Sequence, residues 1–327
     1  MRGLRLLVLL VLAGVRSAAD VAAAEEYRLT GQIRYEDSVR IGMGVSPLVM
    51  LEGITKPFAA HTLADRSGKF TFKKLPPDLY TLIVSIARVG QWQQTVEVSP
   101  GLADSGNRIF VKVFFRPQSR SGTFGGVSVA ELSVPEKARK EYEKAYRRLG
   151  KKDLAGAVAH LEKSVRLAPR FVSAWNVLGT LAFQSGEFAL AESRFREALK
   201  HDPEYYPALV NLGGALLSQN RIPESLETNL AAVRERPDDA LAHSQLGLSY
   251  YFLKKPEEAA RHLERAVALD PAHFSFPHLP LADIYLQMKD TVSAARVLEQ
   301  FLALHPDSAQ APAVRKQLEA LGIGTRD

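Results

Sequence analysis

The most informative absence in this chain of 327 residues is cysteine, which does not occur at all. Without thiols the chain forms no disulfide, no zinc-thiolate site and no cysteine nucleophile, and its N-terminus cannot carry a lipid on cysteine. Tryptophan and methionine are also scarce, with two and four copies. The fold therefore has to be stabilised by packing.

Catalytic motifs are absent as well. The sequence contains no G-x-S-x-G, no P-loop and no dinucleotide fingerprint, and its eight histidines show no metal-ligand spacing. We therefore predict a protein that is not an enzyme and that holds no metal and no cofactor. His273 and His278 flank an irregular turn, and His243 and His262 fall on different helices of one repeat. We expect all four to be surface residues.

The charge distribution is unremarkable for a net charge of +6. No run of Lys and Arg stands out, and no basic stretch alternates with aromatic residues, so we expect no nucleic-acid partner. The charged segment from Glu136 to Arg148 is predicted to be the solvent-exposed face of a helix.

Long apolar runs are confined to the N-terminus. Arg2 and Arg5 precede an apolar stretch from Leu6 to Val15, and Ala22 to Ala24 match an A-x-A cleavage site. This pattern predicts a signal peptide over residues 1–24 and export to the periplasm, the cell envelope or the exterior.

Two alternatives stay open for this segment. Cleavage after Ala19 is a competing possibility, so the mature chain would begin at Asp20 or at Glu25. An uncleaved membrane anchor is the other, although the apolar run falls short of the ~20 residues that a spanning helix needs. We expect no transmembrane span in the mature chain.

Residues 25–116 have the patterning of strands. Short apolar runs alternate with polar residues and are separated by Gly, Pro, Asp and Ser. The expected strands are Tyr27–Tyr35, Leu63–Asp65, Lys69–Phe72, Leu79–Ala87, Gln94–Val98 and Ile109–Phe115. Ser67-Gly68 is predicted to close a tight hairpin, with Phe70 and Phe72 on one face. The segment is predicted to form a small β-sandwich.

The segments Thr30–Ile33, Asp65–Gly90 and Gln94–Val98 together resemble the carboxypeptidase regulatory-like domain, a transthyretin-like sandwich. One departure is Asp78, where the family usually has glycine, and aspartate tolerates the left-handed turn better than most residues. The resemblance implies a non-catalytic accessory module.

Residues 117–135 are rich in Ser and Gly and are predicted to be a linker. Helical periodicity then begins, with prolines 34 residues apart at Pro169, Pro203, Pro237 and Pro271. A fixed period of this size is typical of a solenoid of stacked repeats.

The unit from Val172 to Tyr205 shows the chemistry of one repeat most clearly. It carries an apolar stripe on each of two helices, with a small residue where the helices approach and a proline after the second. These positions are Trp175, Leu178, Gly179, Ala182, Ala191, Phe195, Ala198 and Pro203. They resemble the tetratricopeptide repeat, with Ala182 in place of the usual Tyr. We expect about five repeats over residues 136–308 and a capping helix and tail over 309–327. The predicted architecture is an all-β sandwich followed by an all-α solenoid.

The tetratricopeptide resemblance implies a concave groove lined by the first helix of each repeat. The groove is predicted to be rich in amides and aromatics, which can bind a peptide backbone and apolar side chains. The candidate residues are Tyr142, Tyr146, Asn176, Thr180, Phe183, Gln184, Asn211, Ser244, Gln245, Tyr251, Phe252, Asp283 and Gln287. Each aromatic residue among them has packing against a neighbour as its alternative role.

The resulting hypothesis is an exported scaffold that binds a peptide segment of a partner protein in this groove. The alternative hypothesis assigns recognition of an envelope glycan to the sandwich. In that case Trp92, Tyr35 and Tyr80 would be the stacking rings, unless they belong to the core.

Overall fold

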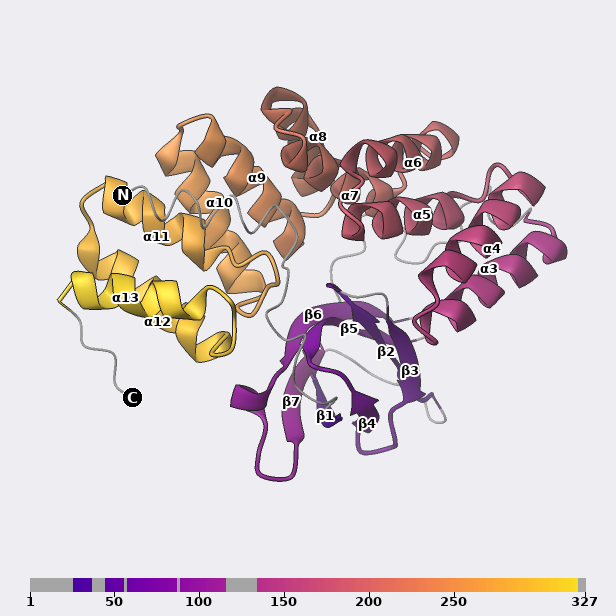
Figure 1. Ribbon diagram of the computed structural model, residues 1–327, viewed down its shortest axis with the longest axis horizontal. Helices are drawn as coiled ribbons and strands as arrows, with labels where there is room; N and C mark the ends of the chain where they lie inside the picture. Colours follow the sequence, from indigo (N-terminus) through magenta and orange to yellow (C-terminus); the bar gives the residue numbers. More distant parts are fainter. Residues whose placement is uncertain (1–25, 37–44, 56–57, 87–88, 116–133, 323–327) are drawn as a thin grey trace.

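The computed structural model describes residues 26–36, 45–55, 58–86, 89–115 and 134–322. Within these ranges seven strands are followed by eleven α-helices (Figure 1). The order of a β region followed by a helical array is the one that the sequence predicts. The predicted signal peptide and nearly all of the predicted linker lie outside the described residues.

The strands form two sheets that pack face to face. They are β1 (Tyr27–Tyr35), β2 (Leu48–Gly53), β3 (Ala59–Leu63), β4 (Lys69–Leu75), β5 (Asp78–Ile86), β6 (Gly90–Val98) and β7 (Arg108–Phe115). One sheet has the order β4-β1-β7 and the other the order β3-β2-β5-β6. Strand β1 pairs antiparallel with β4 and parallel with β7.

The sandwich core explains the alternation in the sequence. Leu29 of β1, Leu82 of β5 and Val113 of β7 have no exposed surface, while their chain neighbours point away from the core. Phe70 and Phe72 lie in this core on the same face, as expected. Gly31 is required there, because a Cβ atom would lie 2.1 Å from the ring of Phe70.

Two features of the sandwich differ from the prediction. Strands β2 and β3 were not expected, because L-V-M-L has no alternation and A-A-H-T-L is a weak strand former. The segment Leu63–Asp65 is the end of β3 and a turn. The Ser67-Gly68 turn exists, with Gly68 at a φ of 78°, but it joins strands of different sheets and not a paired hairpin.

The helices pair into five repeats and a final single helix. They are α3 (Glu136–Leu149), α4 (Leu154–Leu167), α5 (Val172–Gln184), α6 (Phe188–His201), α7 (Tyr206–Ser218), α8 (Ile222–Glu235), α9 (Ala240–Phe252), α10 (Pro256–Leu269), α11 (His278–Gln287), α12 (Thr291–Leu304) and α13 (Ala311–Ala320). In the second repeat, a Cβ atom on Gly179 would lie 2.5 Å from the ring of Phe195. This glycine therefore lets α5 and α6 approach closely, as predicted.

The turn between the two helices of each repeat has the same backbone geometry. One residue there adopts a left-handed φ, namely Lys152, Gly186, Asn220, Lys254 and Lys289 in successive repeats. Only one of the five is glycine, for which this geometry carries no steric cost.

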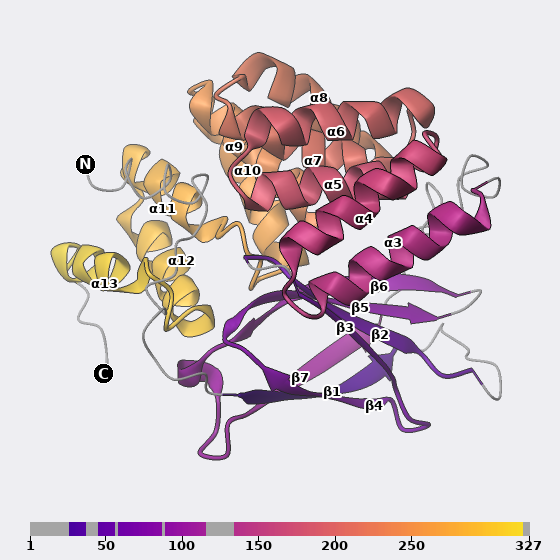
Figure 2. The same cartoon turned by 45° about the vertical axis from the view of Figure 1, so that its right-hand side comes forward.

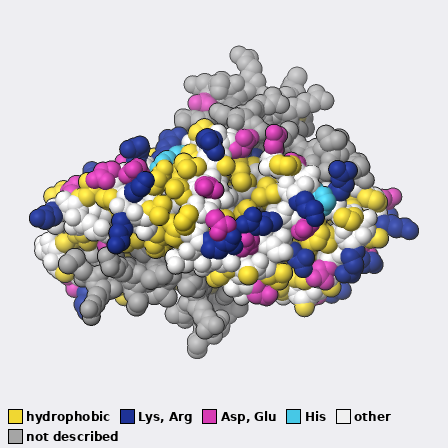
Figure 3. Space-filling model, turned by 90° about the horizontal axis from the view of Figure 1, so that it is seen from above, with side chains coloured by type: hydrophobic (Ala, Val, Ile, Leu, Met, Phe, Trp, Pro, Cys, Tyr) yellow, Lys and Arg dark blue, Asp and Glu magenta, His cyan; other side chains and the backbone are white. Residues whose placement is uncertain are grey.

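The helical array curves over the sandwich. In Figures 1 and 2 the four-stranded sheet lies between the array and the three-stranded sheet, whose outward face points away from the helices. The opposite side of the array, seen in Figure 3, carries basic and acidic side chains intermingled. The sandwich therefore sits on the concave side of the solenoid, where a ligand groove was predicted.

Candidate functional site

The concave side is built by the first helices α3, α5, α7, α9 and α11. All predicted groove residues lie on these helices. The rings of Tyr142 and Tyr146 contact each other in α3 at an angle of 55°, with centroids 5.0 Å apart and hydroxyl oxygens 3.2 Å apart. Burial raises the pKa of both phenols above the usual range, and the nearby Glu52 carboxylate adds to this effect.

Polar groove residues bond to one another from repeat to repeat. Asn211 Nδ2 donates to Asn176 Oδ1 across 3.0 Å, and Thr180 Oγ1 donates to the Asn176 carbonyl. In the later repeats, the Tyr251 hydroxyl and the Gln287 amide both donate to Asp283 Oδ2, each at 2.6 Å. The aromatic members also contact neighbours, since Phe183 packs on Phe188 and Phe252 packs on Tyr251.

Three predicted groove residues are buried, namely Asp283, which bonds to Tyr251 and Gln287, and Ser244 and Gln245, which lie between repeats. Ser244 has no exposed surface and its Oγ lies 2.6 Å from that of Ser275. Gln245 is 8% exposed and lies over Gly214, where a Cβ atom would be 2.7 Å from its amide nitrogen. Both contribute to packing between repeats, which sequence position alone does not distinguish from a place on the groove surface.

The groove is occupied by a segment of this same chain. Gln184 Nε2 donates to the backbone carbonyls of Gly53 and Ile54, at 3.4 and 3.1 Å, at the end of β2. The Ile54 side chain packs against a hydrophobic cluster in the last repeats, to which Leu79 of β5 belongs. Burial raises the pKa of Glu52, directly before this segment. The sequence did not predict this contact, because β2 itself was missed.

Strand β6 makes a second contact with the array. Its outward residues Thr95 and Glu97 are buried. The Thr95 backbone N–H donates to Asp270 Oδ2 at 2.9 Å, and Glu97 Oε2 lies 2.6 Å from His305 Nδ1. Asp307 accepts a further hydrogen bond from the Gly101 backbone N–H. These polar contacts join the sandwich to the loops that follow α10 and α12.

The prediction that the histidines lie on the surface was wrong. His273 is 4% exposed and His278 has no exposed surface, because the irregular turn folds back beneath β6. Burial lowers the pKa of His273 to about 3 and that of His278 to about 4, and it raises that of Asp270 to about 6. Both His278 ring nitrogens lack a hydrogen-bond partner among the described residues.

His243 and His262 are not surface residues either. Their Nδ1 atoms lie 3.0 Å apart and their rings stack, with Tyr250 stacked on His262. Burial lowers the pKa of His262 to about 4. The sequence separation of 19 residues carried no signal for this contact, which depends on the pairing of α9 with α10.

The charged side chains from Glu136 to Arg148 are exposed with the exception of Glu141. Glu141 is 5% exposed and accepts hydrogen bonds from Lys144 and Lys163, with His160 Nδ1 at 2.7 Å. These hydrogen bonds lower the pKa of Glu141 to about 2. This residue therefore joins α3 to α4 as a paired buried charge.

The three rings proposed for glycan stacking belong to the sandwich core or its edge. Tyr80 has no exposed surface and its hydroxyl donates to the Pro76 carbonyl at 2.8 Å. Tyr35 and Trp92 are partly buried against the same core. The presence of an aromatic residue in a strand does not by itself show whether its ring faces the core or the solvent.

Comparison with known proteins identifies the helical region. Residues 142–192 and 176–240 match one family model of the tetratricopeptide repeat, 240–273 match a second and 281–308 a third. The array is built of tetratricopeptide repeats. The helix pairs from α3 to α12 described above are these repeats, and their first helices build the concave side of the array.

Two known proteins share part of this sequence. The type IV pilus assembly protein PilF of Pseudomonas aeruginosa is 27% identical over 173 residues, which cover 51% of this chain and 68% of that protein. The BBSome complex member BBS4 homolog of Drosophila melanogaster is 29% identical over 117 residues. The matched part is 36% of this chain and only 24% of the Drosophila protein.

Among solved structures, MamA from Desulfovibrio magneticus RS-1 is 23% identical and superposes with a TM-score of 0.48. The match covers 54% of this chain and 99% of that one. Within the described ranges, no group of three or more His, Cys, Asp or Glu could hold a metal ion. No helix in the same ranges is long and apolar enough to cross a membrane.

Proposed function

We propose that this protein is an exported, non-enzymatic scaffold that binds a peptide segment of a partner protein in the concave groove of its repeats. The repeat architecture supports this, as does the alternation of amides and aromatics along the groove. The similarity to a protein named for type IV pilus assembly supports a role in building an assembly. Export is supported by the pattern of residues 1–24, and it would place the protein in the periplasm, the cell envelope or outside the cell.

One observation carries the proposal. The Gln184 amide donates to two successive backbone carbonyls, of Gly53 and Ile54. Contacts to backbone carbonyls do not depend on side-chain identity, so they suit any extended segment. The segment bound in this structure is internal. A partner segment would therefore replace residues 53–54, and its apparent affinity would be reduced by the fraction of molecules with the groove closed.

The test uses peptides selected against the full-length chain from a random displayed library. We expect the double variant Asn176→Ala with Asn211→Ala to bind the selected peptides about fivefold more weakly. The two amides would no longer bond to the peptide, and the net loss of a hydrogen bond costs on the order of 1 kcal/mol. Its circular dichroism should match that of the parent. Gln300→Ala with Gln317→Ala, two amides outside the groove, is the matched control.

A second variant separates groove binding from groove closure. Ile54→Ala keeps every groove residue and weakens the seating of the internal segment, so it should bind the same peptides more tightly than the parent. Unchanged affinity in both the Asn176/Asn211 and the Ile54 variants would reject the groove as the binding site.

The sandwich is proposed to be an accessory module of the carboxypeptidase regulatory-like type. Its seven described strands in two sheets support that assignment. N-terminal sequencing of the exported protein would test the processing step. A start at Asp20 or Glu25 supports a cleaved signal peptide, and an intact Met1 supports a membrane anchor.

A further inference from the structure

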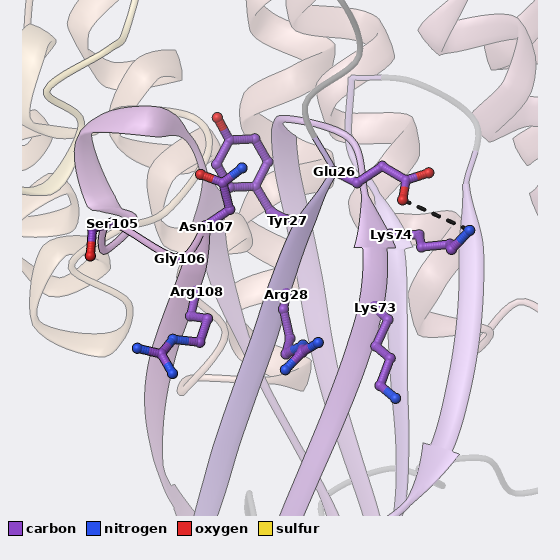
Figure 4. A pocket seen from close by; sticks show the side chains of 9 residues that line it. All are labelled: Glu26, Tyr27, Arg28, Lys73, Lys74, Ser105, Gly106, Asn107 and Arg108. Atoms are coloured by element: carbon purple, nitrogen blue, oxygen red, sulfur yellow. Dashed lines mark ion pairs between the residues drawn. The ribbon is translucent and has the colours of Figure 1, made fainter.

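The outward face of the three-stranded sheet has an unusual composition. Its side chains form rows across β4, β1 and β7. Two rows follow the register of all three strands, namely Thr71, Thr30 and Phe110, then Lys69, Gln32 and Lys112. Arg34 pairs with Phe114 and Arg28 with Arg108, and Lys73 lies beside Arg28 where the register of β1 and β4 shifts (Figure 4). None of these positions carries a carboxylate. The face is therefore a basic surface with two aromatic side chains on one strand.

This face is open to solvent. Phe110 is 58% and Phe114 is 62% exposed, and the helical array lies on the other side of the sandwich (Figure 2). Like charges facing each other across strands are unfavourable, and so are large exposed rings. Nothing in the fold of the sandwich requires either feature, because the core side of the same strands is complete. These properties are typical of a surface that binds a partner.

One end of the face is hollowed. A depression of about 590 Å³ is lined by Arg28, Lys73 and Arg108, by Glu26 and Tyr27, and by the loop before β7 (Figure 4). The Glu26 carboxylate is paired with Lys74 at 3.9 Å. Figure 4 shows Lys73, Arg28 and Arg108 side by side on neighbouring strands. Arg108 is paired with Asp104 at 2.8 Å, whereas Arg28 and Lys73 form no ion pair with the described residues. The depression can accept an anionic group such as a phosphate.

We propose that this face binds the surface of a membrane that contains anionic phospholipids. Charge complementarity supports an anionic partner, and the two phenylalanines can enter the interface between headgroups and acyl chains. The rows paired in register hold five Lys and Arg side chains against two threonines and one glutamine, so the charge of the face favours an anionic partner over a neutral sugar polymer. The proposed membrane site is independent of the peptide groove, because the groove is on the helical array and faces the other sheet of the sandwich.

The experiment is flotation of the full-length protein with phosphatidylcholine vesicles, with and without phosphatidylglycerol. We expect binding only with the anionic lipid and a steep loss of binding as salt is raised. Each basic residue near an anionic surface contributes about fivefold in affinity. Arg28→Gln, Lys73→Gln and Lys112→Gln combined should therefore weaken binding by about a hundredfold. Phe110→Ser with Phe114→Ser should weaken it at least tenfold.

Matched variants away from this face provide the controls. Lys151→Gln, Arg170→Gln and Lys316→Gln combined remove the same charge from exposed sites, and Leu63→Ser with Val292→Ser removes two exposed apolar side chains elsewhere. Both should bind vesicles within about threefold of the parent, allowing for the smaller long-range effect of distant charges. Circular dichroism confirms folding of each variant.

A soluble polyanion and inorganic phosphate complete the test. If heparin binds as tightly as the vesicles and the Phe110/Phe114 variant keeps both activities, the face is a general anion site and the membrane proposal is wrong. Equal binding to vesicles of phosphatidylcholine alone would also overturn it. Loss of vesicle binding in the phenylalanine variant, with weak phosphate binding retained, supports insertion into the bilayer.

Discussion

The two outward faces of the sandwich differ in what covers them. On the four-stranded sheet, Leu79, Thr95 and Glu97 are buried against the repeats. On the three-stranded sheet, the corresponding positions carry basic and aromatic side chains in contact with solvent. The repeats cover the first face and shield it from solvent. The second face keeps like charges and exposed aromatic rings, which lower the stability of the isolated sandwich. The alternation of apolar and polar residues shows which side chains face the core in both sheets. It does not show whether the outward side is covered.

The largest expected effect comes from introducing one charge on each face. Leu79→Asp places a carboxylate in the cluster that contains Phe276 and Phe301, so we expect a loss of about 4 kcal/mol in the free energy of unfolding. Phe110→Asp, on the exposed face, should cost less than about 1 kcal/mol. Urea unfolding of the two variants gives both values. Similar losses in both would show that the two faces are equally buried in solution.

The second expected effect is a pH dependence from the buried histidines near the covered face, to which His262 of the array, with a pKa of about 4, adds in the same direction. His273 and His278 have folded pKa values of about 3 and about 4, below the usual 6.5, so the stability from keeping them neutral is complete above pH 6.5. It is lost as the pH falls below that value. Asp270 has a raised pKa of about 6 in the folded protein, so the folded state gains stability as Asp270 is protonated below pH 6. This gain offsets part of the loss from the histidines, because its pKa shift is smaller than theirs.

Together His273, His278 and Asp270 should contribute a loss on the order of 3 kcal/mol between pH 6.5 and 4.5, as measured by urea unfolding at each pH. His278→Phe removes one titrating group from a site with no hydrogen-bond partner for its ring among the described residues, so its pH profile should be flatter. His61→Phe, at an exposed position of β3, should leave the slope unchanged. A parent profile that is flat in this range would contradict the burial of these histidines.

The smallest effect concerns the charges of the exposed face. Arg28→Gln removes the central cation of the row formed with Lys73 and Arg108, so we expect a gain of about 0.5 kcal/mol in stability. The gain should shrink at high salt, because salt screens exposed charges. Unfolding at two ionic strengths measures it. A loss of stability would mean that Arg28 has a structural role in the sheet.

Much of the fold could be predicted from the sequence because its signals are local. The Pro-to-Pro period and the small residues at Gly179 and Ala191 defined the repeats, and β1 matched its predicted limits. Contacts between the sandwich and the array could not be predicted in this way. They depend on β2, whose apolar run lacks alternation, and on Asp270 and His305, which look like ordinary loop residues in sequence.

The groove was predicted on the correct helices but not its occupant. Asn176 and Gln184 lie where the repeat pattern places them, whereas Ser244 and Gln245 are buried by neighbouring repeats. Position within a repeat determines the helix face. How deeply a side chain lies depends on the curvature of the stack and on what covers it, which no single repeat encodes.

The hydrogen bonds at the junction also set the order in which the protein can assemble during synthesis. Glu97 and His305 are 208 residues apart, and Gly101 and Asp307 are 206 apart. The sandwich can fold once β7 has left the ribosome, and its contacts with Gln184 and Asp270 can form before the last repeat is made. The contacts of Glu97 and Gly101 cannot form until His305 and Asp307 have been made, so a chain ending before residue 300 would leave these two residues without their partners.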